Sequence, residues 1–234
     1  MSVVDENRDG IRKTIRTELL GGDAPAAEVR TIDFHHCAPA DRVAHAKLLG
    51  GLGEHHAAAD QAGLEALVAG ATPAVSVLLP VFYEGYRDAL GVLDLVEREG
   101  LVAWFFIPTA FLDVPVADQH EWALAHELDL AGDDDPRLAL TWDELRDVHR
   151  RGHVVACHTA SHCGVADVTE PDALEREVGA SKARLEEQLD AEVATLAWLW
   201  GTASGLDPAL DAELVARGYR LVFSNDRIQG LPHG

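Results

Sequence analysis

The pattern of hydrophobic and polar positions changes its period several times along the chain. Residues 74–82 (AVSVLLPVF) and 101–107 (LVAWFFI) are apolar runs of strand length, whereas residues 86–99 have apolar positions three and four apart and end at Gly100. Buried strands that alternate with amphipathic helices are typical of parallel βα units, so the sequence predicts an α/β fold. Further strands are predicted at 29–35, 153–158, 193–199 and 219–224, and further helices at 39–69, 119–130, 171–190 and 207–217. Another helix is predicted to begin after Thr141, the N-cap of a TWDE capping box.

The N-terminal segment differs in composition from the rest of the chain. Residues 2–20 are charged and are predicted to form an exposed helix that ends at Gly21. Residues 132–136 (GDDDP) are predicted to be a surface loop. With 234 residues, of which 47% are hydrophobic, the chain is long enough for one sizeable core. We therefore expect an N-terminal helical extension over 1–27 and a single domain over 28–234.

Charge is the most extreme property of the composition. The chain has 40 Asp and Glu residues against 19 Lys and Arg, which gives a formal net charge of −21 at pH 7. Nucleic acids and anionic membranes attract clustered Lys and Arg, so we expect this acidic protein to bind neither. Two explanations of the acidity stay open: an adaptation to high salt, or an ordinary solubilising surface.

Other features of the sequence concern the cellular compartment. No apolar run approaches the roughly 18 residues of a transmembrane helix. The charged N-terminal segment also lacks the apolar block of a secretory signal. The three cysteines, Cys37, Cys157 and Cys163, are an odd number and too few for a disulfide framework. We therefore expect a cytoplasmic protein without membrane insertion.

His158 ends the predicted strand 153–158, and His162 follows four residues later. Twelve histidines in 234 positions give roughly 0.6 such pairs by chance, and we interpret the pair His149 and His153 as one of these. In parallel α/β folds the functional residues lie at the carboxyl ends of strands, which is where His158 falls. The alternative is that His158 caps its strand through a backbone hydrogen bond while His162 is exposed in a loop.

A catalytic metal site needs a third protein ligand besides two imidazoles, with one position left for water. Glu84 follows the predicted strand 74–82 and is the natural carboxylate. Metal-bound water has a pKa near neutrality, which yields a hydroxide nucleophile. Two histidines and one carboxylate also suit non-haem iron. A structural zinc site that includes Cys157 and Cys163 is not expected, because Cys157 and His158 are neighbours on a strand and point to opposite faces.

Four blocks of sequence follow one another in the order of a known family. They are TIDFHHCAPADRVAHAKLLGGL, PAVSVLLPVFYEGYRDALGVLDLVEREGLVAWFFIPTAFLD, LTWDELRDVHRRGHVVACHTASH and ATLAWLWGTASGLDPALDAELVARGYRLVFSND. They are similar to a "Tyr-His" strand, a Thr-Phe-Asp-Asp-Gly-Tyr strand, a His-Ser/Thr-x-x-His block and an Arg/Tyr-Pro-x-Gly segment. These motifs belong to the polysaccharide deacetylases, the NodB-homology or carbohydrate esterase 4 group. The likeness covers residues 28–226.

The resemblance implies a fold, a cofactor and a reaction. The fold is a distorted (β/α) barrel, the cofactor is a divalent metal ion such as zinc, and the reaction is hydrolysis of an N-acetyl or O-acetyl group on a sugar. His158 and His162 match the metal-binding histidines of the family, and Glu84 stands where the family has its metal-binding aspartate. The expected substrate is a small acylated sugar inside the cell.

This sequence departs from the family at three places. Tyr83 stands where the family has the aspartate that acts as general base, and a phenol with an ordinary pKa near 10 is a poor base at neutral pH. Trp200 and Gly201 stand in the loop whose backbone N–H helps to hold the oxyanion, so they are expected to contact substrate, but the usual arginine of that motif has no counterpart. The chain stops at Gly234, before the family's last motif with its acid histidine, and His233 lies too early to replace it.

Other residues are candidates to replace the missing base. Asp33, His35 and His36 end the predicted strand 29–35 and would face the same cavity. Their alternative interpretation is an ordinary polar strand end. Three functions therefore stay open at this stage: a divergent hydrolase with relocated catalytic groups, a family member without catalysis that binds a sugar or a partner, or a protein whose two histidines and one carboxylate serve a different reaction.

Overall fold

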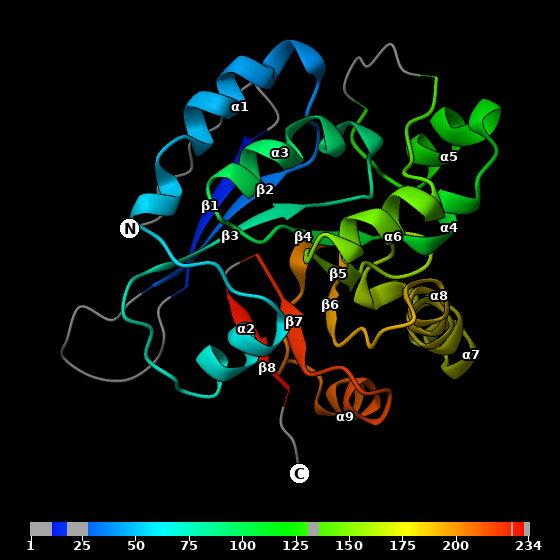
Figure 1. Cartoon of the computed structure of the whole chain (residues 1–234). Coiled ribbons are helices and arrows are strands. Elements are labelled where there is room, and N and C mark those ends of the chain that lie inside the picture. Colours follow the sequence, from blue (N-terminus) through cyan, green and yellow to red (C-terminus); the bar gives the residue numbers. More distant parts are fainter. Residues whose placement is uncertain (1–10, 18–27, 131–135, 226, 232–234) are drawn as a thin grey trace.

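The computed structural model describes residues 11–17, 28–130, 136–225 and 227–231. Within these residues, eight strands form one sheet in sequence order, and the sheet curls into a partial barrel (Figure 1). Strands β2 to β7 are parallel, while β1 and β8 run antiparallel to their neighbours at the two edges. The strands are β1 (Ile11–Thr17), β2 (Val29–Phe34), β3 (Val77–Phe82), β4 (Trp104–Ile107), β5 (Val154–Cys157), β6 (Thr195–Ala197), β7 (Leu221–Phe223) and β8 (Ile228–Gly230).

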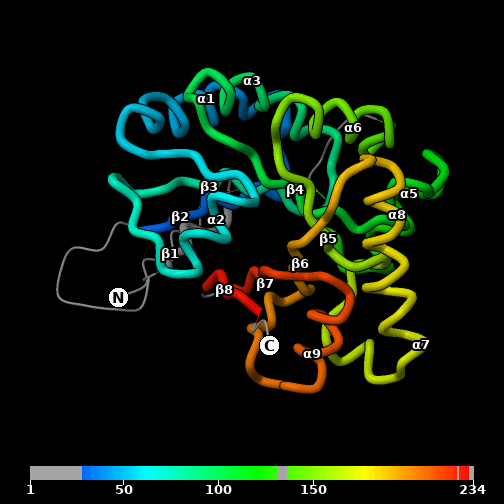
Figure 2. The backbone as a smooth tube through the Cα atoms, turned by 60° about the horizontal axis from the view of Figure 1, so that its bottom comes forward, coloured from blue at the N-terminus to red at the C-terminus, as the bar shows by residue number. Residues whose placement is uncertain are grey.

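Helices surround the outer face of the curled sheet. Figure 2 shows α1, α3 and α6 along one side of the curled sheet and α8 and α9 along the adjacent side. Helix α2 instead packs its buried leucines against the inner face. The helices are α1 (Arg42–Leu49), α2 (Gln61–Val68), α3 (Leu90–Arg98), α4 (Thr109–Asp113), α5 (Gln119–Ala125), α6 (Trp142–Arg150), α7 (Pro171–Leu174), α8 (Ala180–Leu189) and α9 (Pro208–Ala216).

Side chains on β3 show how one apolar strand serves two cores. Val77, Leu79 and Val81 belong to the cluster inside the barrel, whereas Leu78 and Phe82 belong to the cluster between the sheet and the outer helices. This alternation follows from the two-residue period of a strand. Both faces of the sheet are covered, which explains why its strands are nearly continuous apolar runs in the sequence.

The α/β fold expected from the sequence is confirmed: the structure is a distorted barrel of parallel strands with helices around it. The sequence TWDE at 141–144 predicts a capping box at the start of α6, and this is confirmed too. The Glu144 N–H donates to Thr141 Oγ1 over 3.2 Å, and the Thr141 N–H donates to Glu144 Oε2 over 2.9 Å.

The helix expected over residues 2–20 is wrong where the structure describes it. Residues Ile11–Thr17 form β1, which pairs with β2, while 1–10 and 18–20 lie outside the described residues. The segment IRKTIRT is rich in β-branched residues, and the edge of β2 offers it unpaired backbone groups, so strand pairing outweighs the weak helical pattern. The division between 1–27 and 28–234 stays a prediction, and the loop expected at 132–136 lies almost entirely outside the described residues.

Two of the expected helices are interrupted. The stretch 39–69 contains α1 and α2, separated by a turn in which Gly51 has a φ of 81°, a conformation that favours glycine. The stretch 171–190 contains α7 and α8, separated by one π-helical turn at Glu175–Gly179. The short elements α4 and β8 have no predicted counterpart, because each is too short to show a period in the sequence.

Candidate active site

Aromatic and imidazole rings from three parallel strands meet at the carboxyl edge of the barrel's inner face. His35 follows β2, Tyr83 follows β3 and His158 follows β5. The rings of His35 and Tyr83 stack with centroids 5.4 Å apart, and the Tyr83 and His158 centroids are 5.6 Å apart. Tyr83 also stacks on Phe106 of β4 at 5.2 Å. The position of His158 at a strand end, expected from the sequence, therefore brings it to a cluster of polar rings.

His158 and His162 lie side by side, with ring centroids 4.8 Å apart. His158 Nδ1 lies 2.8 Å from the carbonyl oxygen of Ala197, and His162 Nδ1 lies 2.8 Å from that of His126. A carbonyl oxygen can only accept, so each Nδ1 must carry the hydrogen and donate it. In the neutral rings each Nε2 then keeps a lone pair that can bind a ligand.

Burial keeps both rings neutral. The pKa of His158 is well below its usual value, first because the ring is buried and second because of the neighbouring charge of His162. The pKa of His162 is lowered by burial as well, against the raising effect of its hydrogen bond to the His126 carbonyl. Neutral imidazole is the form that binds metal ions, so both residues are in the protonation state that a ligand needs.

Glu84 is held by a histidine of the neighbouring strand. His35 Nδ1 lies 2.9 Å from Glu84 Oε1, and because a carboxylate accepts, His35 donates from Nδ1 and leaves its Nε2 with the lone pair. Glu84 is only 4% exposed, and its other oxygen, Oε2, accepts no hydrogen bond from the described residues. Its φ of 69° is unusual for a residue with a side chain, which is typical of strained functional turns.

The donor chemistry at this edge fits a divalent ion. His158 and His162 are neutral and are oriented through Nδ1 by backbone carbonyls, the usual arrangement of metal-binding histidines. Glu84 adds a buried carboxylate oxygen that has no hydrogen-bond partner among the described residues. Among the described residues, however, no three His, Cys, Asp or Glu side chains are already gathered around one point. The three predicted ligands therefore fit in kind and are not preassembled as a triad.

The alternative zinc site with two cysteines finds no support in the geometry. Cys157 is fully buried with its Sγ 3.3 Å from Ser181 Oγ, in the outer core cluster. Its neighbour His158 faces the ring cluster on the inner side. The two side chains point to opposite faces of the strand, as the sequence indicated.

Tyr83, which the sequence resemblance places where a general base is expected, does not have the pKa of a base. Its pKa is raised well above the usual value of a phenol, mainly by burial and further by the negative charge of Asp33. The hydroxyl therefore stays protonated at neutral pH, so it is able to donate a hydrogen bond. Asp33 is itself buried, 5% exposed, near Tyr83.

His36 lies away from the cluster of rings, although it follows His35 directly. Its Nδ1 is 3.1 Å from Asp88 Oδ2, its Nε2 contacts the carbonyl oxygen of Asp129, and its ring lies on Tyr86. Burial lowers the pKa of His36, but the hydrogen bonds to Asp88 and Asp129 outweigh burial and raise it. Of the three candidate bases at the end of β2, the structure therefore brings His35 and Asp33 to the site and engages both nitrogens of His36 elsewhere.

Trp200 and Gly201 belong to a turn, Leu199–Gly201, that begins two residues after the end of β6. The Trp200 side chain is 71% exposed, and both residues have positive φ angles of 65° and 58°. Asn225 fixes this turn, because its Nδ2 donates to the Trp200 carbonyl over 2.7 Å and its N–H donates to the Gly201 carbonyl over 3.1 Å. A Cβ at position 201 would lie 2.6 Å from Asn225, so only glycine fits there. The Trp200 side chain is thus largely exposed to solvent.

Several groups that shape the site were not anticipated from the sequence. The carbonyls of His126 and Ala197 orient the two histidines, but backbone oxygens leave no mark in a sequence. Glu177 accepts hydrogen bonds from Ser161 inside the histidine loop. It is one of several acidic residues in a predicted helix, and only the structure shows that it points inward.

The chain belongs to the polysaccharide deacetylase family, whose family model matches residues 82–214. The matched stretch contains Glu84, His158 and His162. No curated protein sequence is significantly similar to the chain.

Solved structures share the fold at low sequence identity. The deacetylase PplD of Streptococcus pyogenes, in complex with acetate, has a TM-score of 0.65 and 16% identity, with 85% of this chain and 84% of that chain covered. IcaB from Ammonifex degensii has a TM-score of 0.53 and 17% identity over 79% of this chain and 73% of that chain. BC0361, a polysaccharide deacetylase from Bacillus cereus, has a TM-score of 0.56 and 16% identity over 91% of this chain and 58% of that chain. Among the described residues, no helix is long and apolar enough to cross a membrane.

Proposed function

We propose that this protein is a metal-dependent hydrolase that removes an acyl group from an N-acetyl-sugar-like substrate. The observation that carries the proposal is the pair His158 and His162, two neutral imidazoles 4.8 Å apart. Both have Nδ1 bound to backbone carbonyls and Nε2 left with its lone pair. Membership of the polysaccharide deacetylase family supports the reaction class.

The residues that would hold the ion are His158, His162 and Glu84. A divalent ion such as zinc, when bound, polarises an acyl carbonyl and lowers the pKa of water. The chain's own contribution is to keep the two imidazoles neutral and oriented. It also keeps one buried carboxylate oxygen of Glu84 without a hydrogen bond from the described residues.

Proton transfer is assigned to His35 rather than to Tyr83. His35 donates from Nδ1 to Glu84, so its Nε2 has a lone pair that can accept a proton from the attacking water, and Glu84 stabilises the imidazolium that forms. The protonated hydroxyl of Tyr83, whose ring stacks on His35, is suited to donate a hydrogen bond to the oxyanion of the intermediate. The exposed indole of Trp200 is suited to stack on a sugar ring.

The test is release of acetate from N-acetylglucosamine oligomers and from small acylated sugars by zinc-loaded protein. We expect turnover by the parent chain, and a loss of about 10²–10⁴-fold in kcat for His35→Gln, the range typical of general acid–base catalysis. His36→Gln is the matched control, because His36 is the adjacent histidine but lies outside the ring cluster. Equal losses in the two variants, or full activity in His35→Gln, would remove His35 from the mechanism.

One observation favours a second function. The family's basic carboxylate is replaced by Tyr83, whose raised pKa excludes the role of base, and this change suits a protein that binds sugars without hydrolysing them. The two functions differ in one experiment. Binding of an N-acetyl-sugar oligomer that persists after treatment with a chelator, without acetate release from any acylated sugar, would establish the binding function.

A further inference from the structure

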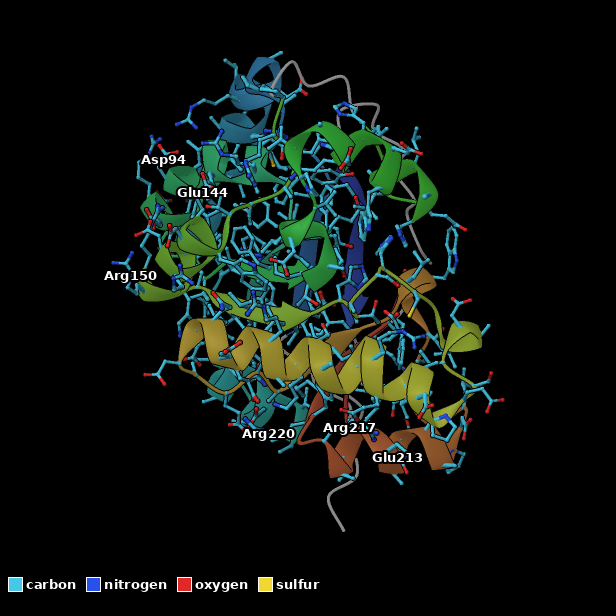
Figure 3. The ribbon with its side chains drawn as sticks, turned by 90° about the vertical axis from the view of Figure 1, so that its right-hand side faces the viewer. Asp94, Glu144, Arg150, Glu213, Arg217 and Arg220 are labelled. Atoms are coloured by element: carbon cyan, nitrogen blue, oxygen red, sulfur yellow. The ribbon has the colours of Figure 1, made fainter. Side chains whose placement is uncertain are left out.

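A π-helical turn interrupts the helix that packs behind the histidine loop. The turn, Glu175–Gly179, joins α7 to α8, and Figure 3 shows this helix lying across the face that is turned to the viewer. A π-turn inserts one extra residue into a helix and so changes the direction of the side chains around it. Glu177, in the middle of the turn, is only 7% exposed, which is unusual for a glutamate.

Glu177 binds the residue that precedes His162. Its Oε2 accepts hydrogen bonds from the N–H of Ser161 over 2.9 Å and from Ser161 Oγ over 3.0 Å. Hydrogen bonds to a charged acceptor are stronger than those between neutral groups. Arg176 Nε lies 3.5 Å from the other Glu177 oxygen, Oε1, and its side chain is 65% exposed. The buried carboxylate is therefore satisfied mainly by the histidine loop.

The residue that follows His162 is held within the same loop. The Cys163 N–H donates to Thr159 Oγ1 over 2.9 Å. The chain is therefore fixed on both sides of His162, by Glu177 before it and by Thr159 after it.

The backbone of His162 needs such support. Its φ is 59°, and Thr159 in the same loop has a φ of 65°, a left-handed conformation that residues with a Cβ rarely adopt. Such a conformation persists where surrounding contacts fix it from several sides. Ser181 of α8 supplies a second contact, because its Oγ donates to the Thr159 carbonyl over 2.9 Å.

We infer that Glu177 is a positioning residue of the site, which holds the left-handed turn at His162 and thereby the direction of the His162 ring. The ring's hydrogen bond to the His126 carbonyl, and with it the exposure of Nε2 to a ligand, depends on this turn. The relevance to hydrolysis rests on the proposed function, whereas the geometric claim does not.

The experiment follows the Nδ1–H proton of His162 by NMR in metal-free protein. Three variants are compared with the parent: Glu177→Gln removes the charge at nearly constant shape, Ser161→Ala removes one of its two hydrogen bonds, and Glu175→Gln is the control. Glu175 lies in the same π-turn but pairs with Arg217 on the surface. Thermal unfolding is recorded in parallel, so that a general loss of structure is recognised.

We expect the Nδ1–H signal of His162 to be lost or averaged in Glu177→Gln and weakened in Ser161→Ala. The corresponding signal of His158 and the control Glu175→Gln should be unchanged. The affinity for Co²⁺, used as a probe of the metal site, is measured for the parent and the same variants. It should fall about tenfold or more in Glu177→Gln, the scale known for residues that orient metal ligands. An unchanged His162 signal in Glu177→Gln would overturn the inference, and should that variant not fold, an unchanged signal in Ser161→Ala would do so. A parent that binds no cobalt but shows the signal changes would contradict only the proposed function.

Discussion

A neutral histidine offers a lone pair from one ring nitrogen only, and at His158 and His162 the surrounding backbone decides which one. The spacing of the two residues and their place after a strand predict a pair of ligands. The carbonyls of Ala197 and His126 make the pair chemically specific, because they bind both Nδ1–H groups and leave both Nε2 atoms to a ligand. The sequence predicts the residues, whereas the tautomer follows from folded backbone that no motif encodes.

Removal of either histidine should abolish tight metal binding. We expect His158→Ala and His162→Ala to lose at least about tenfold in zinc affinity, because each deletes one of three protein ligands. Elemental analysis and titration of the purified variants measure this. His149→Ala is the control, since His149 lies on α6, away from the ring cluster. A parent without zinc under any loading condition, or variants that load as well as the parent, would contradict the site.

Substitutions at Tyr83 distinguish an enzyme whose general base lies elsewhere from a protein that has lost catalysis. If catalysis was lost through this residue, Tyr83→Asp should create measurable deacetylation of an N-acetyl-sugar oligomer, since a positioned base contributes about 10²–10⁴-fold. If His35 is the base, the parent already turns over substrate, and Tyr83→Phe should reduce kcat by removing the hydroxyl while it preserves the stacked ring. Steady-state kinetics on the three proteins distinguish these results. Full activity in Tyr83→Phe would show that the hydroxyl plays no part.

At the scale of elements, the sequence predicts those helices and strands whose signals come from residues close together in the chain. The strand β3 and the capping box of α6 were predictable because each depends on neighbouring positions. The strand β1 was not, since its pairing with β2 is a tertiary contact that outweighs a weak helical pattern. The π-turn at Glu175–Gly179 was also unpredictable, because it depends on what the helix packs against. Glu177, the proposed positioning residue, lies in that unpredicted turn.

His153 joins the start of β5 to its neighbours and makes stability depend on pH. Its Nδ1 accepts the Ala103 N–H over 3.1 Å, and its Nε2 is 3.2 Å from Glu97 Oε1. Burial lowers the pKa of His153 below its usual value of 6.5, and the nearby charge of Arg151 adds to this, against the raising effect of Glu97. As the pH falls below 6.5, His153 binds a proton in the unfolded chain but stays neutral in the folded protein. The free energy of unfolding therefore falls towards acid pH.

We expect His153→Gln to be less stable than the parent near neutral pH. Between about pH 7.5 and 5.5 its free energy of unfolding should fall less steeply than that of the parent. Urea unfolding of the metal-free proteins at both pH values measures the two slopes. The neighbouring variant His149→Gln should keep the slope of the parent. A slope in His153→Gln as steep as that of the parent would assign the pH dependence to other groups.

At the scale of the whole molecule, the acidic surface includes many ion pairs between arginines and carboxylates. Figure 3 shows Asp94, Glu144 and Arg150 along one side and Glu213, Arg217 and Arg220 along another. Most of these contacts are solvent-exposed, where each pair contributes little to stability. With 40 acidic against 19 basic residues, many carboxylates cannot find a cation, and they repel one another.

Salt should reveal which explanation of the acidity is right. If the surface is adapted to high salt, the melting temperature should rise markedly from dilute buffer to about 1 M salt. At that concentration the Debye length is only about 3 Å, so the repulsion between surface carboxylates is screened. Calorimetry with sodium chloride measures this, and an equal concentration of sucrose controls for effects that do not depend on charge. A flat salt profile would identify the acidic residues as an ordinary solubilising surface.

The order of strands in the sheet also determines how the chain can fold during synthesis. Each strand from β2 to β8 pairs with the one that the ribosome released just before it. Each newly released strand can therefore add to an edge that already exists, without waiting for a distant segment to be translated. A partly synthesised chain has its most recent parallel strand as the growing edge, and the antiparallel β8 pairs with the last of these parallel strands, β7. We expect nascent chains of this protein to acquire protease resistance in steps, one βα unit at a time.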